Sequence, residues 1–288
     1  MWRCCHKVNK DSEPSRQLRK IRLVSALFAL EIARLMSRPF FSHATDVGLH
    51  RDNNEDLIVC RADLGLFLVA DGMGGHEAGE VASAIAGQVV GDSIAQGASL
   101  VAAVQQAHQA IVHSPDQGRG HRGMGSTIVA LLSRGKQYEI AWVGDSRAYV
   151  WSGPVHQRSL QQLTIDHSYV QMLYQRGVIT AAEMARHPEK NIITQCLGST
   201  DLEQVKVDSL VCDWEPGDWV LLCSDGLSDA VSDQVICDIL SEHSQPDDAV
   251  KQLVQTALNH GGRDNISVVV VSYPANSWWR RVGSWFGR

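Results

Sequence analysis

Four aspartates each stand beside an apolar stretch, in a turn that also contains a glycine, a serine or an asparagine. They are Asp71 in Ala-Asp-Gly, Asp145 in Gly-Asp-Ser, Asp225 in Ser-Asp-Gly and Asp264 in Arg-Asp-Asn. Taken singly, each is well explained as an ordinary turn residue. If the strand ends converge, however, the carboxylates share one site, where their mutual repulsion requires protonation or divalent cations.

The polar loop 49–56 adds an arginine and two further acids. Arg51 stands four residues before Glu55, and Asp56 follows directly. One interpretation is a surface loop with incidental charges. In the functional interpretation Glu55 faces bound metals and Arg51 binds a phosphate oxygen, because guanidinium suits bidentate recognition of phosphate.

All of these candidate ligands are oxygen donors. The sequence contains no His-x-x-x-His and no Cys-x-x-Cys pair, so the donor set favours Mg²⁺ or Mn²⁺ over zinc. Two such ions about 3.5–4 Å apart can generate a bridging hydroxide at neutral pH and stabilise in-line displacement at phosphorus. The predicted chemistry is hydrolysis of a phosphate ester by direct attack, without a covalent enzyme intermediate.

Other phosphate chemistries lack their motifs. The sequence has neither a Cys-x₅-Arg loop nor a Walker loop, which argues against a thiol phosphatase and a nucleotide-hydrolysing enzyme. Ser126 and Thr127 are interpreted as residues that begin a strand rather than as nucleophiles, since a metal hydroxide would serve instead.

The elements that must position these residues follow from the apolar pattern. The run 66–70 is too short for a helix and predicts a buried strand that ends at Asp71. Gly72 and its neighbouring glycines allow a sharp turn and close approach of other groups, and Glu77 and Glu80 then begin an alanine-rich helix.

Strands come in runs rather than alternating with helices one to one, which favours antiparallel sheets covered by helices over a parallel sheet. We predict further strands at 44–48, 57–61, 127–132, 138–143, 147–151, 205–211, 218–223 and 266–271. We predict helices at 79–96 and 100–113, short helices at 169–177 and 180–186, and a helix that begins at Pro246 and ends before Gly261.

Composition describes one large, ordinary globular domain. Of the 288 residues, 44% are hydrophobic and 20% charged, and the net charge of −6 argues against a nucleic-acid binder. The 7 cysteines are odd in number, which together with the missing Cys-x-x-Cys pairs predicts a reduced, cytoplasmic protein.

The two ends differ from the remainder. Residues 1–41 are expected to be a loosely ordered or non-native extension, either an amphipathic helix or a segment upstream of a true start at Met36. The tail 275–288 is rich in tryptophan and arginine. Either it contacts a membrane through one helical face, or it folds onto its own domain or is an unstructured end.

Together these motifs resemble the metal-dependent serine/threonine protein phosphatases of type 2C, in particular the small single-domain bacterial branch. The resemblance runs from about Ser42 to Tyr273. Its motifs, in order, are Arg51 to Asp56, Ala70 to His76, Gly125 to Thr127, Val143 to Arg147, Leu163 to Ser168, Ser224 to Gly226 and Gly262 to Asn265.

The resemblance implies an α+β fold, a four-layer α-β-β-α sandwich of two antiparallel sheets with a helix pair on each outer face, over residues 42–274. It implies two metal ions, Mn²⁺ or Mg²⁺, and a weaker third. By this pattern the ligands would be Asp71 as the bridge, the Gly72 carbonyl, Asp225, Asp264 and Glu55, with Asp145 at the third ion, Asp56 behind the ligands and Arg51 on the substrate phosphate.

One position departs from the animal members of the family. They carry a histidine two residues after the bridging aspartate as a proposed general acid, and Met73 stands there in this chain. His76 is either a replacement acid or simply a histidine in the first turn of a helix. Residues 163–198 correspond to the variable flap.

The resemblance predicts a monomeric protein phosphatase that acts on phosphoserine and phosphothreonine proteins, among them a cognate kinase and its substrates. A non-catalytic phosphoprotein-binding module would have lost the metal-binding acids, which are all present. A nuclease-like phosphodiesterase would need a basic cleft with aromatic platforms, and the acidic balance argues against it.

Overall fold

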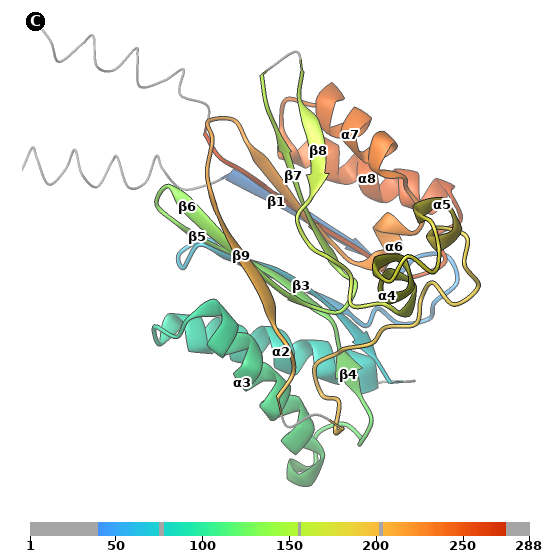
Figure 1. Ribbon diagram of the computed structural model, residues 1–288. Helices are drawn as coiled ribbons and strands as arrows, with labels where there is room; N and C mark the ends of the chain where they lie inside the picture. Colours follow the sequence, from blue (N-terminus) through green and yellow to red (C-terminus); the bar gives the residue numbers. More distant parts are fainter. Residues whose placement is uncertain (1–39, 75–77, 155–156, 202–203, 275–288) are drawn as a thin grey trace, which may run out of the picture. The chain divides into compact units, whose positions relative to one another are not determined.

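Two antiparallel sheets lie face to face at the centre of the protein, with helices on both outer sides (Figure 1). The computed structural model describes residues 40–74, 78–154, 157–201 and 204–274. The predicted α+β sandwich is confirmed, and the antiparallel pairing of every named strand agrees with the sequence pattern.

The first sheet combines both ends of the described chain. Its order is β1-β11-β10-β7-β8. The strands are β1 (Phe40–Asp46), β7 (Arg147–Ser152), β8 (Ser159–Gln162), β10 (Trp219–Cys223) and β11 (Ile266–Ser272). The central strands β10 and β11 are buried along their whole length, as expected for apolar runs covered on both faces.

The second sheet contains β3, the strand that carries Asp71 and continues past the predicted end to Met73, because Gly72 and Met73 pair with β4. Its order is β2-β3-β5-β6-β9, and the short β4 pairs with the end of β3. The strands are β2 (Asp56–Arg61), β3 (Leu66–Met73), β4 (Gly125–Ser126), β5 (Ile128–Arg134), β6 (Gln137–Val143) and β9 (Asp208–Asp213).

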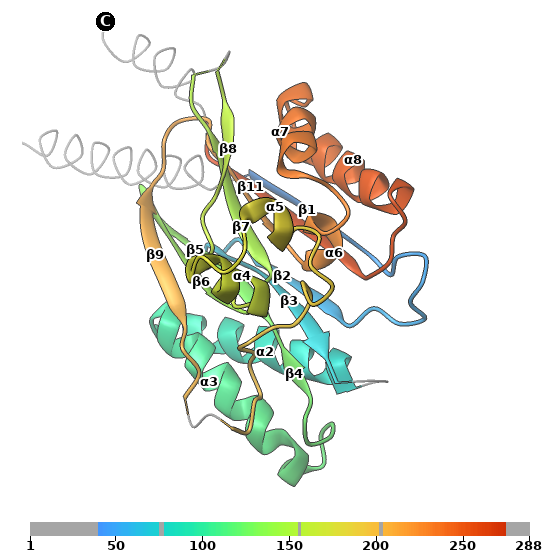
Figure 2. The same cartoon turned by 45° about the vertical axis from the view of Figure 1, so that its right-hand side comes forward.

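Three apolar clusters hold the layers together. Side chains such as Phe67, Ile140 and Val269 fill the space between the sheets. Helices α2 (Ala78–Ala95) and α3 (Leu100–His113) cover the second sheet, and α7 (Asp233–Glu242) and α8 (Pro246–Asn259) cover the first. Figure 2 shows the two helix pairs on opposite outer sides.

Sequence signals explain where these helices begin. Helix α3 follows Ser99, whose side chain accepts a hydrogen bond from the Ala102 N–H. Helix α8 has Pro246 in its first turn with two aspartates behind it, at the positive end of the helix dipole. Both helices lie within a residue or so of their predicted positions.

The flap, residues 163–198, connects β8 of the first sheet to the segment before β9 of the second. It contains α4 (Tyr169–Gln175) and α5 (Ala181–Met184), capped by Ser168 and Thr180. Two further short helices, η1 (Ser114–Gln117) and α6 (Asp225–Ser228), follow α3 and β10. Both flap helices occur where the sequence predicts them, each shorter than expected.

Several boundaries differ from the sequence prediction. β1 begins at Phe40 and ends at Asp46 rather than Gly48, because the backbone at Gly48 has φ 78° and leaves the strand. β9 starts at Asp208 rather than at residue 205, and Val205 is buried in the apolar cluster between the helices α2 and α3 and the second sheet. β8 and α7 were not assigned from the sequence.

No helix within residues 40–74, 78–154, 157–201 and 204–274 is long and apolar enough to cross a lipid bilayer. The tryptophan-rich tail 275–288 and most of the extension 1–41 lie outside the described residues.

Candidate metal centre

The strand register brings the predicted acids to one end of the two sheets. Asp56 and Asp71 are direct partners in the antiparallel pair of β2 and β3. In the other sheet Arg147 pairs with Cys223, so Asp145, just before β7, and Asp225, just after β10, leave the same end of neighbouring strands.

The charges of these aspartates act on one another. Burial, followed by the charges of Asp56, Asp225, Asp145 and Asp264, raises the pKa of Asp71 well above its usual value. Burial, followed by the charges of Asp145 and Asp264, also raises the pKa of Asp225 well above its usual value. The aspartates from four separate stretches of sequence therefore lie in one another's electrostatic field.

Two carboxylate oxygens of these acids are buried without a hydrogen-bond partner. They are Oδ1 of Asp56 and Oδ1 of Asp225. The second oxygen of Asp56 accepts a hydrogen bond of 2.8 Å from the Ser224 hydroxyl. Buried polar atoms are normally satisfied, so two orphaned carboxylate oxygens among mutually repelling acids fit a site for cations.

Gly72 lies where no side chain fits. A Cβ at this position would be 2.1 Å from the Gly79 carbonyl oxygen and 2.7 Å from that of Glu55. The Gly72 N–H donates to the same Glu55 oxygen at 3.1 Å. This close approach joins the end of β3, the Glu55 loop and the start of α2, and it explains why glycine follows Asp71.

Ser126 and Thr127 have structural partners. The Ser126 hydroxyl donates to the Thr127 carbonyl oxygen at 2.7 Å. The Thr127 hydroxyl accepts a hydrogen bond of 3.1 Å from the Asp71 N–H and lies 2.7 Å from the Ser146 hydroxyl. These contacts fix the backbone beside Asp71 and Asp145, which agrees with the interpretation of both residues as strand-start structure.

Arg51 forms an ion pair with Asp264, one of the predicted metal-binding acids. Its Nη2 lies 2.7 Å from Asp264 Oδ2, with the two side chains 50% and 35% exposed. Glu55 lies nearby, and burial raises its pKa while Arg51 opposes the shift. Within the described ranges no three acidic, histidine or cysteine side chains converge as a metal-binding cluster. The acids lie at one end of the sheets without meeting at one point.

Residues 75–77, which include His76, lie outside the described residues, so the structure gives no position for the candidate general acid. Met73 is the last residue of β3 and pairs with Gly125 of β4.

Sequence reasoning missed the role of Asn265. Its side-chain oxygen accepts a hydrogen bond of 2.8 Å from the Glu55 N–H, and its Nδ2 donates to the carbonyl oxygens of Val47 and Asn53, both at 2.9 Å. Asn265 therefore holds the Arg51–Glu55 loop against the start of β11, directly beside Asp264. The only signal was its position next to that aspartate.

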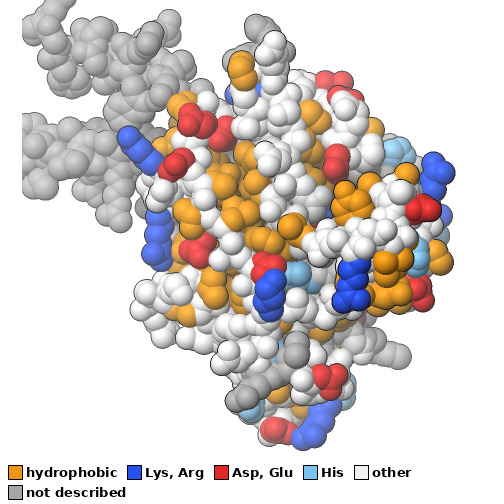
Figure 3. Space-filling view, viewed as in Figure 1, with side chains coloured by type: hydrophobic (Ala, Val, Ile, Leu, Met, Phe, Trp, Pro, Cys, Tyr) orange, Lys and Arg blue, Asp and Glu red, His pale blue; other side chains and the backbone are white. Residues whose placement is uncertain are grey.

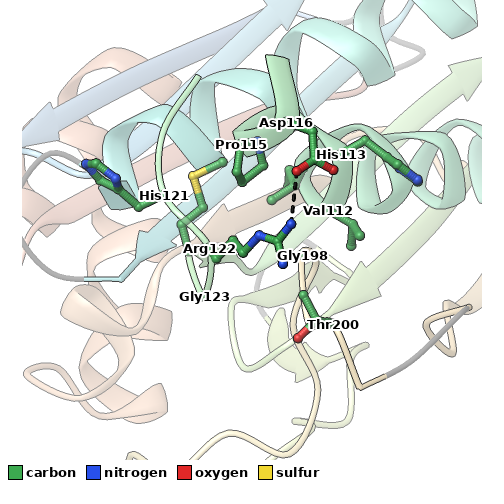
Figure 4. A pocket seen from close by; sticks show the side chains of 11 residues that line it. Val112, His113, Pro115, Asp116, His121, Arg122, Gly123, Gly198 and Thr200 are labelled. Carbon is green, nitrogen blue, oxygen red and sulfur yellow. Dashed lines mark hydrogen bonds and ion pairs between the residues drawn. The ribbon is translucent and has the colours of Figure 1, made fainter. Parts of the chain in front are cut away.

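A cavity of about 200 Å³ lies beside β4, apart from the acids. Residues of α3, η1 and the loop before β4 line it, with Arg122 paired to Asp116 at 3.1 Å (Figure 4). None of the predicted metal-binding residues lines this cavity, so the candidate for phosphate chemistry remains the group of acids at the end of the sheets.

In excess chelator we expect the melting temperature to fall between pH 5 and pH 7.5. Burial raises the pKa of Asp56 and of Asp145 to about 6, against about 3.9 in an unfolded chain. The folded state thus binds these protons more tightly, so their stabilisation is present at low pH and is lost as the pH rises from about 4 through about 6.

Calorimetry in EDTA would measure this change, expected to exceed about 2 °C, which corresponds to ~1 kcal/mol in a domain of this size. The Asp56→Asn variant should show a smaller fall. A melting temperature that rises or stays constant over this range would contradict the raised pKa values.

A four-layer sandwich with mutually repelling carboxylates at one end of its sheets fits a metal-dependent hydrolase. A family model described as protein phosphatase 2C matches residues 46–261. The chain belongs to this family.

Its relatives are bacterial phosphatases. Protein phosphatase PhpP of Streptococcus pneumoniae is 37% identical over 239 residues, which cover 79% of this chain and 95% of PhpP. The crystal structure of the Mycobacterium tuberculosis serine/threonine phosphatase PstP/Ppp superposes with a TM-score of 0.75 at 34% identity, covering 82% of this chain and 99% of the other.

A second solved structure bears on the metal. It is the catalytic domain of serine/threonine protein phosphatase PstP in complex with two manganese ions, with a TM-score of 0.72 at 33% identity. It covers 82% of this chain and 98% of its own. Metal dependence thus belongs to the family fold.

Proposed function

We propose that the protein is a Mg²⁺- or Mn²⁺-dependent serine/threonine protein phosphatase that hydrolyses phosphoserine and phosphothreonine and opposes a bacterial protein kinase. The observation that carries the proposal is that burial and neighbouring carboxylates raise the pKa of both Asp71 and Asp225, beside two unpartnered carboxylate oxygens. A phosphate monoester is a dianion, and such a group of acids can bind it only after cations have reversed its charge.

Two ions would be held by Asp71, the Gly72 carbonyl, Asp225, Asp264 and Glu55, and a weaker third by Asp145 together with Asp225. When bound, they would neutralise these acids, lower the pKa of a water molecule and stabilise negative charge on the phosphoryl oxygens. Asp56 would help to position these ligands rather than bind a cation itself, since one of its oxygens accepts a hydrogen bond from Ser224, next to Asp225.

Arg51 would bind the phosphate of the substrate. Its guanidinium is half exposed and bonds only one of the Asp264 oxygens in the structure. Most of its donors are therefore available to a phosphate that approaches from solvent, and the planar guanidinium can hold two phosphoryl oxygens at once. Arg51 would orient the phosphorus without forming a bond to it.

The substrates would be phosphoproteins, among them a cognate kinase and that kinase's substrates. The relatives named above are protein phosphatases, and two of the three are named as serine/threonine enzymes. We also propose a cytoplasmic location, because the five described cysteines are free thiols, as is usual in a reducing compartment.

A panel of phosphopeptides in Mn²⁺ buffer tests this function. We expect release of phosphate from phosphoserine and phosphothreonine peptides, and much slower release from the phosphotyrosine peptide of the same sequence. A diester such as bis(p-nitrophenyl) phosphate serves as the second comparison. Preferential hydrolysis of the diester would favour a phosphodiesterase instead, and equal turnover of all three peptides would contradict the serine/threonine assignment.

A further inference from the structure

A loop of glycine and basic residues joins η1 to β4. This segment, the arginine loop (residues 118–123), has the sequence Gly-Arg-Gly-His-Arg-Gly, and its three glycines have φ of 76°, 67° and 89°. Glycine adopts this left-handed backbone readily, whereas other residues do so only at a cost. The glycines therefore fix the shape of the loop, and between them it presents two exposed arginines.

The charge of the arginine loop contrasts with that of the whole protein. The chain has a net charge of −6, whereas the loop contains two arginines, one histidine and no acid. Arg122 Nη2 lies 3.1 Å from Asp116 Oδ1, and the two side chains are 81% and 63% exposed. Arg119 forms no ion pair with any residue that the structure describes. Both guanidinium groups thus keep donors for an anionic partner.

Each of the two arginines lines a hollow in the surface. Arg122 lines the cavity of about 200 Å³, whose walls include the apolar Ile111 and Met124 (Figure 4). Arg119 lines a second cavity of about 240 Å³, together with Glu80 of α2. At the lowest point of the view in Figure 3, basic and histidine side chains lie beside acidic ones, where Figure 1 places the end of α3. Apolar walls with a guanidinium at the rim suit a side chain that has methylene groups and a carboxylate.

The arginine loop lies close to the predicted metal-binding acids without belonging to them. Met124, directly after the loop, packs against Gly74, where a Cβ would lie 2.9 Å from the Met124 Cα. Gly74 follows Asp71 by three residues, and Met73 between them pairs with Gly125 of β4. An extended chain advances about 3.3 Å per residue, so about three residues lead from Asp71 to the wall of the first cavity.

We propose that the arginine loop is a subsite for an acidic residue of the phosphoprotein substrate, a glutamate or aspartate that lies about three or four positions from the phosphorylated residue and binds Arg122 and Arg119. An extended substrate whose phosphate is at the acids would place such a residue over the loop. This inference rests on the proposed function and adds a sequence preference to it.

Asp116 would limit this preference. Among the described residues that line the first cavity it is the only acid, and it occupies one nitrogen of the Arg122 guanidinium. Exposed ion pairs of this kind are weak, so a substrate carboxylate can compete with Asp116 for Arg122. The strength of the preference therefore depends on a competition between two carboxylates for one guanidinium.

Hydrolysis of matched phosphothreonine peptides by the whole protein in Mn²⁺ buffer tests the subsite. One series carries a single glutamate at each position from −5 to +5 in an alanine background, and the peptide without glutamate is the reference. We expect glutamate three or four positions from the phosphothreonine to lower KM by about fivefold with kcat unchanged, because this contact is the same in bound substrate and transition state. The preference should shrink in high salt, since exposed charges are screened.

Substitutions at the ion pair should move the preference in opposite directions. Arg122→Gln should reduce it to less than about twofold, and Asp116→Asn should raise it to about tenfold because Arg122 loses its competitor. Arg119→Gln should reduce it by about twofold. Hydrolysis of p-nitrophenyl phosphate, which is too small to reach the loop, should be the same in all three variants. A loss of this activity together with the preference would indicate a structural role and overturn the subsite.

Two arginines elsewhere provide matched controls. Arg61→Gln corresponds to Arg122→Gln, because Arg61 forms an exposed pair with Asp63 at the far end of β2 from the acids. Arg134→Gln corresponds to Arg119→Gln, because Arg134 is exposed at the end of β5. Both control variants should keep the wild-type preference. An equal change in either of them would make the effect one of net charge and would contradict the subsite.

The outcomes separate this inference from the proposed function. If phosphopeptides are hydrolysed with the same KM whether or not they carry glutamate, the subsite is wrong and the function stands. Fluorescence anisotropy of labelled peptides measures binding without turnover. If no phosphopeptide is hydrolysed, but the glutamate peptide binds more tightly than the reference and Arg122→Gln abolishes the difference, the subsite is supported and the function is wrong.

An anionic lipid surface is the competing partner for exposed arginines. Sedimentation with phosphatidylserine vesicles measures that binding in the same variants. If Arg122→Gln loses vesicle binding while its peptide preference is unchanged, the loop belongs to a lipid contact and the subsite is overturned.

Discussion

Replacing Asp71 by asparagine is expected to lower phosphopeptide turnover by about a thousandfold or more. Asp71 sits at the end of β3, opposite Asp56, and burial together with the charges of Asp56 and Asp225 raises its pKa. An amide in this place removes the charge that would hold two cations. Metal ions contribute several kcal/mol to such reactions, and ~4 kcal/mol corresponds to about a thousandfold in rate.

Excess chelator should reduce the wild-type protein to the same background, and added Mn²⁺ should restore it. In Asp71→Asn neither addition should change the rate. Phosphate release from a phosphothreonine peptide measures all four conditions. Wild-type turnover that persists in chelator would contradict metal dependence.

Loss of fold is excluded by a second measurement. Because Asp71 is repelled by its neighbours, Asp71→Asn should melt at a higher temperature than the wild-type protein in chelator at pH 7.5. Asp63→Asn provides the control, since Asp63 is exposed and paired with Arg61 in the distant β2–β3 connection. It should keep full activity. An inactive Asp71→Asn protein with a lowered melting temperature would leave misfolding as the explanation.

The part of the fold that the sequence predicts well is the part made of continuous apolar runs. β10 and β11 are buried throughout, and β3 is buried except at Asp71 and Met73, so their run length and flanking turns define them. β8 lies at a sheet edge and has a single apolar residue, Leu160, in a polar segment. Its pairing with β7 depends on tertiary structure, which no local pattern encodes.

Helix α7 was missed although it carried a signal. Its buried residues Ile236, Ile239 and Leu240 have helical spacing, and Ser232 stands at its N-terminus. The preceding Ser-Asp-Gly motif was interpreted as a turn, whereas Asp225 and Gly226 form the start of helix α6, with Ser224 at its N-terminus.

For the candidate site, the sequence indicates which residues carry charge, and the structure adds what holds them. Strand-end aspartates are visible one by one. Their placement at one end of the sheets depends on the register of β2 with β3 and of β7 with β10. Contacts such as those of Asn265 with the loop more than 200 residues earlier join segments that no spacing rule connects.

Gly226 next to Asp225 leads to the last prediction, in which Gly226→Ala is expected to damage both stability and metal binding. A Cβ at Gly226 would lie 1.9 Å from the carbonyl oxygen of Asn265. That atom is backbone and cannot move aside as a side chain would. The variant must therefore push α6 away from the start of β11, and with it Asp225 away from Asp264.

Overpacking of this kind costs about 3 kcal/mol, which lowers the melting temperature of such a domain by roughly 6–12 °C. The affinity for Mn²⁺ and the turnover should fall with it, because two of the proposed ligands no longer share their spacing. Calorimetry and Mn²⁺ titration measure the two effects on the same sample.

Gly91→Ala is the matched control for this substitution. A Cβ at Gly91, within helix α2, would meet no atom within 4 Å. Alanine is favoured over glycine in a helix by about 1 kcal/mol, so this variant should melt slightly higher and keep its activity. Gly226→Ala could instead behave like Gly91→Ala. In that case the contact between α6 and Asn265 does not set the distance between Asp225 and Asp264, and the spacing of these two proposed metal ligands has another cause.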